Sequence, residues 1–469
     1  MRYSVLLGFC LALFLVACGG DGISIEKPCP GSPPPLVLCP GLDQSFGIGG
    51  WTVLDSTTGG EPGWVGIDTE IDGSGRIVVA GSSRGNWVRD MRLWRFDDTG
   101  ALDSTFGVGG SVVHPMPGGV DDYAVAVVID GSGRILAAGR GRGPGSGYDV
   151  VVWRVDSSGA LDPSFGAGGV AVYDHNPGMG ADDWATALAL DAGGNILVAG
   201  STRPTRWDHD TLLLRLDPAG DLDPSFGTGG VIAQDFSGGT NLSDYARDVI
   251  VDSSGRILLT GHLTSDLNRT GTDLVVWRFD PSGVLDPSFG NGGLATYDRS
   301  MTSLTVNEIG YALALDAIER IIVAGTLSPV PGSGWSTDAA LWRFDPSGVL
   351  DQSFGAFGVV LQDGAVGKPD SEDAAFSVAV DASGRILAGG QSTFAFCTTD
   401  MVVWRFDDRG TLDPTFGCQG VFTHNPEAGH PRSSSASSIE IDRLGRIIAV
   451  GAGSSSDFGI NLTLWRLLQ

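Results

Sequence analysis

The chain has 469 residues, of which 42% are hydrophobic, and it carries a formal net charge of −26. This length allows a large buried core, and the charge argues against nucleic acid as a partner because its phosphates would be repelled. The 72 glycines and 24 prolines stay below the share typical of disordered chains, so short strands and tight turns are expected.

Residues 1–17 are predicted to be a targeting leader. Arg2 gives a short positive start, and Ser4 to Val16 is apolar but too short to span a bilayer. The leader ends in Leu-Val-Ala before Cys18, which resembles the lipobox of bacterial lipoproteins. The resemblance implies that Cys18 carries lipid and that Gly19 directs the protein to the outer membrane, facing the periplasm or the cell surface. An ordinary signal peptide with a chance cysteine is the alternative.

Residues 18–41 form a tether rich in proline and glycine. Once Cys10 is removed and Cys18 is acylated, two local cysteine pairs are left, Cys29 with Cys39 and Cys397 with Cys418. An even number of cysteines fits an oxidising compartment. We therefore expect a disulfide between Cys397 and Cys418, with Cys29 and Cys39 as a second candidate pair.

Residues 42–469 are governed by an internal repeat. The string Leu-Asp-x-Ser/Thr-Phe-Gly starts at Leu42, Leu102, Leu161, Leu222, Leu285, Leu350 and Leu412, in steps of 59 to 65 residues. Two further strings recur in the same order: Trp or Leu followed by Arg, and Asp followed by a glycine turn and an apolar run. A period of this kind indicates an array of equivalent structural units.

Each unit is predicted to contain four short strands, which in the second unit cover residues 110–114, 123–130, 134–139 and 149–156. Four antiparallel strands in a repeated unit suit a propeller blade. We therefore predict an all-β fold, a seven-bladed β-propeller of four-stranded antiparallel blades. Small residues in the second and third strands and tryptophan in the fourth predict that residues 110–114 lie innermost and the tryptophan strand at the rim.

The phase of the units decides how the ring closes. In the phase chosen above, the last unit ends on its own fourth strand, and no strand exchange closes the ring. If residues 49–54 instead complete the last blade, this phase is wrong.

The unit Leu-Asp-Pro-Ser-Phe-Gly-x-Gly-Gly, present at Leu161, Leu222 and Leu285, resembles the delta-60 repeat family. The resemblance extends over residues 42–469 and implies a bacterial surface protein of the β-propeller type. It implies no particular function.

Residues that recur in every unit are expected to serve the blade, because a catalytic residue is needed only once. The arginine of the second string and the aspartate of the first belong to this class, and we expect them to satisfy turn amides and to pair across blades. The turns and linkers are nearly uniform at one end of the strands, whereas the loops at the other end vary. Binding residues concentrate in such variable loops.

Aromatic residues in these variable loops are the candidate ligand-binding residues: Trp87, Tyr148, Trp207, Trp335 and Phe396. Rings of this kind bind sugars or protein partners. The alternative is that each ring covers the end of its own blade.

A metal or acid–base site is the second candidate, formed by Asp174, His175, Asp208 and His209, which are expected to share one blade. Acids before several strands also make calcium the one cofactor to consider, although their recurrence equally fits capping. The residues show no catalytic constellation. We therefore expect a surface-anchored, non-enzymatic binding or scaffold propeller for a glycan or an envelope protein. The alternative is a hydrolase or lyase of cell-surface polymers, with or without a metal.

Overall fold

The computed structural model describes residues 41–54, 64–85, 88–115, 121–142, 147–175, 181–205, 208–237, 242–264, 271–298, 306–329, 337–363, 371–394, 398–424, 433–454 and 460–469. All of them belong to the compact unit Cys39–Gln469. Over these ranges the regular structure is entirely β. A search of the same ranges finds no helix with the length and hydropathy of a membrane span.

The strands of the first half are β1 (Trp51–Leu54), β2 (Trp64–Ile71), β3 (Ile77–Gly85), β4 (Val88–Phe96), β5 (Ser111–Val113), β6 (Tyr123–Ile129), β7 (Ile135–Gly141), β8 (Asp149–Val155), β9 (Val170–Tyr173), β10 (Asp182–Leu190), β11 (Ile196–Thr205), β12 (Asp208–Leu216), β13 (Val231–Gln234) and β14 (Asp244–Val251). Those of the second half are β15 (Ile257–Thr264), β16 (Thr272–Phe279), β17 (Leu294–Tyr297), β18 (Val306–Leu315), β19 (Ile321–Pro329), β20 (Asp338–Phe344), β21 (Val359–Gln362), β22 (Glu372–Val380), β23 (Ile386–Phe394), β24 (Thr398–Phe406), β25 (Val421–His424), β26 (Ser438–Ile441), β27 (Ile447–Ser454) and β28 (Ile460–Leu467).

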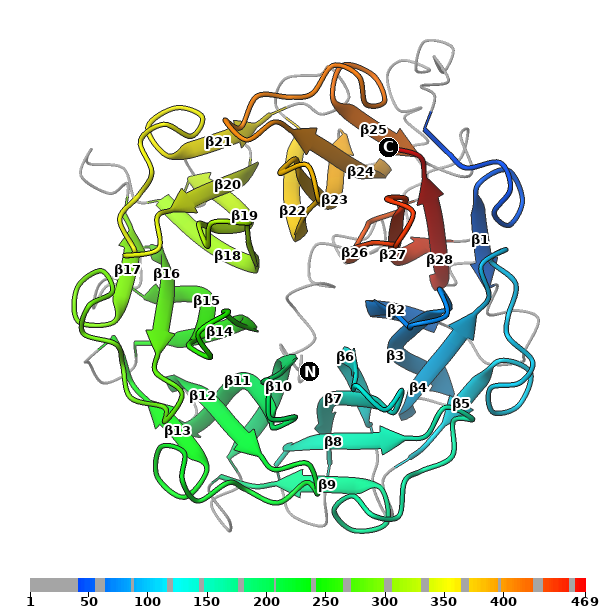
Figure 1. Ribbon diagram of the computed structural model, residues 1–469, viewed down its shortest axis with the longest axis vertical. Coiled ribbons are helices and arrows are strands. Elements are labelled where there is room, and N and C mark those ends of the chain that lie inside the picture. The colour runs from blue at the N-terminus through cyan, green and yellow to red at the C-terminus, as the bar shows by residue number, and fades with distance from the viewer. Residues whose placement is uncertain are drawn as a thin grey trace, which may run out of the picture. The chain divides into compact units, whose positions relative to one another are not determined.

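These strands form antiparallel sheets of four, arranged around a central axis with β2, β6, β10, β14, β18, β22 and β26 nearest that axis (Figure 1). The strand orders are β2-β3-β4-β5, β6-β7-β8-β9, β10-β11-β12-β13, β22-β23-β24-β25 and β1-β28-β27-β26. Strands β14–β17 and β18–β21 are joined into one larger sheet by a single parallel pair, Thr272 with Asn307.

Local sequence explains the short strands and tight turns. In the turn between β6 and β7, the Asp130 carboxylate accepts the backbone N–H of Ser132 at 2.8 Å and that of Arg134 at 3.0 Å. Gly133 completes the turn with a φ of 78°, a conformation that residues with a Cβ adopt at a cost. The same Asp-to-Gly turn recurs between the first two strands of most sheets.

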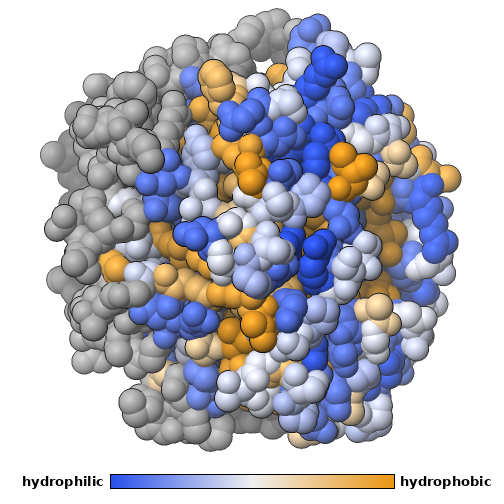
Figure 2. Space-filling view, turned by 60° about the vertical axis from the view of Figure 1, so that its left-hand side comes forward, coloured by the Kyte–Doolittle hydropathy of each residue, from blue (hydrophilic) through white to orange (hydrophobic). Residues whose placement is uncertain are grey.

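The hydrophobic core lies between neighbouring sheets. Leu93 on β4 packs in one cluster with Trp153 on β8, and both side chains are fully buried. Burying a tryptophan stabilises the fold by about 5 kcal/mol in surface-area terms. Another cluster joins Phe46 and Trp94 to Leu464 on β28, so the last sheet packs against the first. On the side shown in Figure 2, exposed hydrophobic residues form small groups among hydrophilic ones.

The predicted strand phase is wrong by one strand. Residues 111–113 (β5) pair with β4 as the outermost strand of the preceding sheet, and β6 is the innermost strand of the next. The tryptophan strand is therefore third, below the rim. The linker is long enough to cross a sheet, but it folds back locally: Asp103 N–H donates to the Arg95 carbonyl at 2.8 Å, which sets the following strand beside β4.

The same shift changes how the ring closes. β1 pairs with β28, with Trp51 opposite Trp465, so the start of the repeat completes the sheet formed by the end of the chain. The Arg466 side chain donates to Asp43 at 2.8 Å across this junction. The alternative stated for residues 49–54 is therefore the correct one, and the ring is closed by strand exchange.

Candidate functional site

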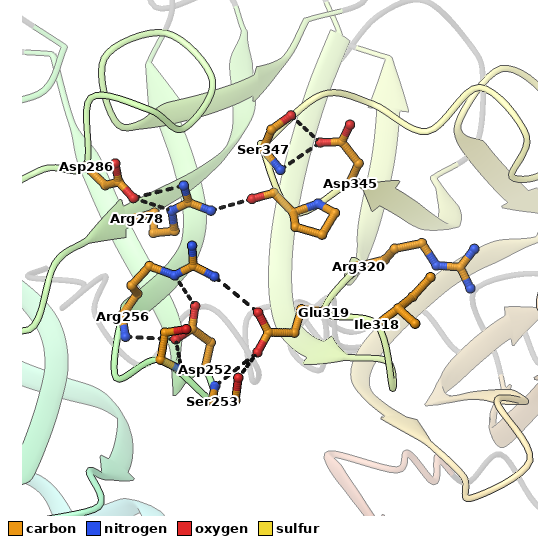
Figure 3. A network of polar contacts seen from close by, with 12 residues as sticks. Asp252, Ser253, Arg256, Arg278, Asp286, Ile318, Glu319, Arg320, Asp345 and Ser347 are labelled. Carbon is orange, nitrogen blue, oxygen red and sulfur yellow. Dashed lines mark hydrogen bonds and ion pairs between the residues drawn. The ribbon is translucent and has the colours of Figure 1, made fainter.

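The recurring arginines form joints between the sheets (Figure 3). Arg278 Nε donates to Asp286 at 2.9 Å, and its Nη1 donates to the carbonyl oxygen of Pro346 in the next sheet. Its guanidinium carbon lies 4.4 Å from the ring centroid of Phe289. The guanidinium–carboxylate pair and the ring contact recur at Arg95, Arg154, Arg215, Arg343, Arg405 and Arg466. The structural role predicted for these residues is confirmed.

Glu319, in the turn between β18 and β19, departs from the repeat, and its role is also structural. Glu319 has a φ of 63° at the turn position that other sheets fill with glycine. Its carboxylate accepts a hydrogen bond from Arg256 Nη2 at 3.1 Å and another from the Ser253 hydroxyl (Figure 3). Glu319 thus ties two neighbouring turns together.

Several predicted residues lie outside the part of the chain that the structure describes: Cys18, Cys29, Cys39, Trp87, Trp207, Trp335, Phe396 and Cys397. Cys418 is described and forms a disulfide. Its predicted pairing with Cys397 stays a prediction.

Tyr148 lies at the variable-loop end, immediately before β8. Its hydroxyl donates to Asp121 Oδ2 at 2.7 Å, and the guanidinium carbons of Arg140 and Arg142 lie 4.4 and 5.3 Å from its ring centroid. The guanidinium carbon of Arg140 also lies 4.7 Å from the centroid of Tyr123 on β6. Tyr148 is therefore one member of a larger aromatic and cationic cluster.

The four predicted metal ligands do not share one sheet. Asp174 and His175 follow β9, the outer strand of one sheet, whereas Asp208 and His209 begin β12 of the next. The prediction of a shared blade fails because the strand phase was shifted. Within the described ranges, no group of three or more His, Cys, Asp or Glu residues is arranged to hold a metal ion. The side chain of Asp208 lies outside those ranges.

Three neighbouring sheets carry an aromatic residue at the same point of their first strand. Tyr123 pairs with Arg140, Trp184 with Ser201, and Tyr245 with His262, in each case just before a β-bulge. Val65, Ile309 and Ala374 hold the equivalent positions in other sheets. The repeat is therefore broken in one sector of the ring.

Four rings of this sector form a continuous series of contacts, which we call the aromatic belt: Trp184, His209, Tyr245 and His262. Ring centroids are 5.2 Å apart for Trp184 and His209, 4.7 Å for His209 and Tyr245, and 4.8 Å for the stacked pair of Tyr245 and His262. The bulge residue Arg247 places its guanidinium carbon 5.4 Å from the Tyr245 centroid. Bulges commonly re-aim side chains in this way beside functional sites.

A pocket of about 210 Å³ opens beside the belt and is lined by Ser243, Tyr245, His262, Thr264, Gly271, Thr272 and Asn307. His262 is only 4% exposed, and its Nδ1 is buried without a hydrogen-bond partner in the described structure. Burial, together with the positive charges of Arg247 and His209, holds the pKa of His262 well below its usual range. Its imidazole is therefore neutral near pH 7 and can accept a proton.

Two carboxylates near this pocket accept hydrogen bonds from other groups. Asp244 accepts the Ser237 N–H at 3.0 Å and a hydrogen bond from the Ser237 hydroxyl, and burial raises its pKa to about 6. Asp248 accepts the Leu313 and Val249 N–H groups, both at 2.8 Å. Burial raises the pKa of Asp248 to about 7. No Asp or Glu side chain is among the lining residues described above.

A second acidic group lies on the first strands of the first and last sheets. Asp68 accepts the Val127 N–H of the next sheet at 2.8 Å and the Ser438 hydroxyl of the last sheet at 3.0 Å. Burial raises the pKa of Asp68 to about 6 and that of Glu70 to about 7, and it raises the pKa of Glu440 well above its usual range. Asp68 thus links three sheets near the axis.

Sequence reasoning placed His209 in the metal or acid–base candidate and assigned no role to Trp184, Tyr245, Arg247 or His262. The signal that finds them is the strand register: an aromatic residue directly follows Asp122, Asp183 and Asp244, where the other units have none at this point.

Six segments of the chain match the family described as "Domain of unknown function (DUF5122) beta-propeller": residues 73–106, 131–165, 194–226, 253–289, 320–354 and 382–416. These matches support a β-propeller repeat family. The search of curated proteins gave no match.

Solved structures with a similar fold include polysaccharide lyase Uly1, at 10% identity over 86% of this chain and 89% of that chain, with a TM-score of 0.49. They also include Trypanosoma rangeli sialidase, at 11% identity over 73% and 54% of the two chains, with a TM-score of 0.41. Chaetomium thermophilum Sqt1 matches at 13% identity over 86% and 95%, with a TM-score of 0.42.

This comparison corrects the prediction that the chain is not an enzyme. The similar structures include a polysaccharide lyase and a sialidase, so the fold does not exclude catalysis. At such identities these proteins are similar to this chain in fold alone.

Proposed function

We propose that the protein acts on a cell-surface polysaccharide at the pocket beside Tyr245 and His262. The observation that carries this proposal is the neutral, buried imidazole of His262, whose Nδ1 lacks a partner while the residue lines an open pocket. A buried polar group of this kind costs free energy, which a ligand or a reaction can offset. A neutral imidazole can accept a hydrogen bond or a proton from a bound substrate.

The lining of the pocket suits a sugar polymer. It combines the aromatic ring of Tyr245 with the short polar side chains of Ser243, Thr264 and Asn307. Sugars bind to such combinations of an aromatic platform and a few placed polar groups. The belt spans four strands of two sheets, β10 and β12 of one and β14 and β15 of the next.

We further propose seven blades, of the delta-60 type, held at the outer membrane by lipid on Cys18. The blade count is supported by the 28 strands and by β1 completing the last sheet. The lipid anchor is supported by the sequence around Cys18 alone. Replacing Cys18 with Ser should release the protein from membranes, and a variant that stays in the membrane fraction would refute the anchor.

The proposed activity is tested by incubating the mature protein with a panel of acidic and neutral polysaccharides and measuring new reducing ends. His262→Gln keeps a polar side chain but removes the base, and we expect the rate to fall about 100-fold or more. The matched control is Thr326→Ala, because Thr326 holds the same register position opposite Ile309 in a sheet without the belt. If no polymer is cleaved, or if His262→Gln cleaves as well as the control, the proposal is wrong.

A further inference from the structure

We infer that the propeller docks onto the lipid surface of the membrane through the end that carries the uniform turns and linkers, which we call the uniform end. This inference rests on the lipid anchor proposed at Cys18 and adds an orientation of the folded domain to it. The pocket beside Tyr245 and His262 lies at the opposite end of the strands, so docking leaves it facing away from the lipid.

Exposed apolar side chains gather at the uniform end. Of the ten large hydrophobic residues that are exposed within the described ranges, eight lie in its turns, its linkers and the chain end, and the other two are on the outer strands β9 and β21. We call the eight the apolar arc: Val284, Ile318, Val349, Phe357, Leu444, Leu468, Ile48 and Val108. Their exposed fractions run from 50% to 89%.

The apolar arc occupies one side of the ring. Its members belong to the sheets β14–β17, β18–β21, β26–β28 with β1, and β2–β5, and the arc passes over the β22–β25 sheet between them (Figure 1). The sheets β6–β9 and β10–β13 carry small or polar residues at the equivalent positions: Ser132, Ala160, Ala167, Gly193, Asp221 and Thr228. The fold therefore does not require large apolar residues there, and a one-sided group of them indicates a contact surface.

Phe357 departs most from the repeat. Its backbone has a φ of 59°, at a position where Gly168, Gly229 and Gly292 stand in other units, and its side chain is 79% exposed. A left-handed backbone costs free energy for a residue with a Cβ, and an exposed ring gains nothing from burial in the isolated domain. An apolar environment outside the domain offsets this cost.

The point at which the chain enters the domain favours lipid as the partner. The Leu468 N–H donates to the Gly41 carbonyl at 2.7 Å, so the described chain begins within the arc, beside β25 and β1 (Figure 1). Only residues 19–40 separate this point from Cys18, and even fully extended they reach at most about 80 Å. A lipid on Cys18 therefore keeps the arc near the bilayer at a high effective concentration, at which weak contacts suffice.

Two arginines outside the repeat lie on the two sheets beside this entry point. Arg409 follows β24, Arg443 lies in the turn between β26 and β27, and both are exposed. Other units have small residues at these positions, such as Ser158 and Gly131. A chain with a net charge of −26 is repelled by anionic lipid in general, and local arginines oppose this by binding phosphate head groups.

The experiment uses the lipidated mature protein in vesicles of phosphatidylethanolamine and phosphatidylglycerol that contain a phospholipid with a diazirine on its acyl chain. After irradiation, the peptides that carry lipid are identified by mass spectrometry. We expect lipid on the linkers that hold Ile48, Val108 and Phe357, and far less on the equivalent linkers that hold Ala167 and Thr228.

A triple variant tests the side chains themselves. Ile48→Thr, Val108→Asn and Phe357→Gly each introduce the residue that another unit carries at that position, so the variant should fold. Lipid labelling of these linkers should fall about 10-fold or more, while cleavage of polysaccharide in solution stays unchanged. The matched control, Ala167→Thr, should be labelled like the wild type.

Each other outcome decides against docking. Equal labelling of all the linkers, or of the triple variant and the wild type, would overturn docking and leave the lipid anchor intact. If the wild type is missing from the membrane fraction, the anchor fails and docking fails with it. If the Cys18→Ser protein forms a dimer in sedimentation and the triple substitution abolishes that dimer, a second copy of the chain covers the arc, and docking onto lipid is wrong.

Discussion

The acidic groups at the axis predict an unusual dependence of stability on pH. Glu70 on β2 and Glu440 on β26 hold the same register position in neighbouring sheets. Burial, with the nearby charge of Asp68, raises the pKa of Glu70 from 4.5 to about 7. Between these values the folded protein holds a proton that the unfolded chain releases. The contribution of Glu70 is therefore fully present below about pH 4.5 and is lost as the pH rises through about 7.

We expect Glu70→Gln to remove this loss. A pKa difference of this size corresponds to roughly 3 kcal/mol, so the variant should be more stable than the wild type by up to that amount at about pH 8. The two should be equally stable near pH 4 because both side chains are then neutral. Urea unfolding followed by tryptophan fluorescence, at pH values from about 4 to 8, measures the difference.

The control is Asp408→Asn, which removes one negative charge from an exposed linker. It separates the effect of burial from that of lowering the net charge. If Glu70→Gln and Asp408→Asn change the free energy of unfolding equally at pH 8, the argument from burial is refuted. A gain for Glu70→Gln that persists at pH 4 would refute it as well.

Three further predictions concern the stability of the fold. Burial lowers the pKa of His424 to about 4, and its Nδ1 accepts the Trp465 Nε1–H at 3.0 Å. The stability that neutral His424 contributes should therefore be lost as the pH falls from about 6.5 to 4, by roughly 3 kcal/mol. In acid unfolding, His424→Gln should reduce this dependence of stability on pH. Asp43→Ala leaves the guanidinium of Arg466, 2% exposed, without its carboxylate, and should cost about 3 kcal/mol in urea unfolding, against no change for an exposed linker aspartate. Reducing the disulfide of Cys418 should cost about 3 kcal/mol, and a non-reducing peptide map that joins Cys418 to a cysteine other than Cys397 would refute the predicted pair.

The sequence was sufficient to predict the repeat, the short strands and the structural arginines, because each of these is a local pattern. It was not sufficient for the phase. A periodic string does not mark where a unit begins, and the linker is long enough to reach either edge of a sheet. The deciding fact is a pairing between chain ends, Trp51 with Trp465, which no local pattern contains.

The candidate site was harder to predict for a related reason. His209 and His262 are visible in the sequence, but their meaning depends on Tyr245 between them, and that contact joins two sheets. The sequence prediction favoured the variable loops and therefore named residues such as Trp87 and Trp335. The described aromatic cluster instead lies on regular strands, beside the β-bulges of β10 and β14.

The position of His262 offers a test of whether stability or function explains it. The same register position is filled by Thr326 and by Ala452 in other sheets, and both are buried, so the fold accepts a smaller residue there. His262 leaves a buried nitrogen without a partner, which costs about 1–3 kcal/mol. We therefore expect His262→Thr to unfold at an equal or higher urea concentration than the wild type while losing polysaccharide cleavage. A variant that is clearly destabilised would mean that the imidazole serves packing, and the proposed role of His262 would then lose its physical basis.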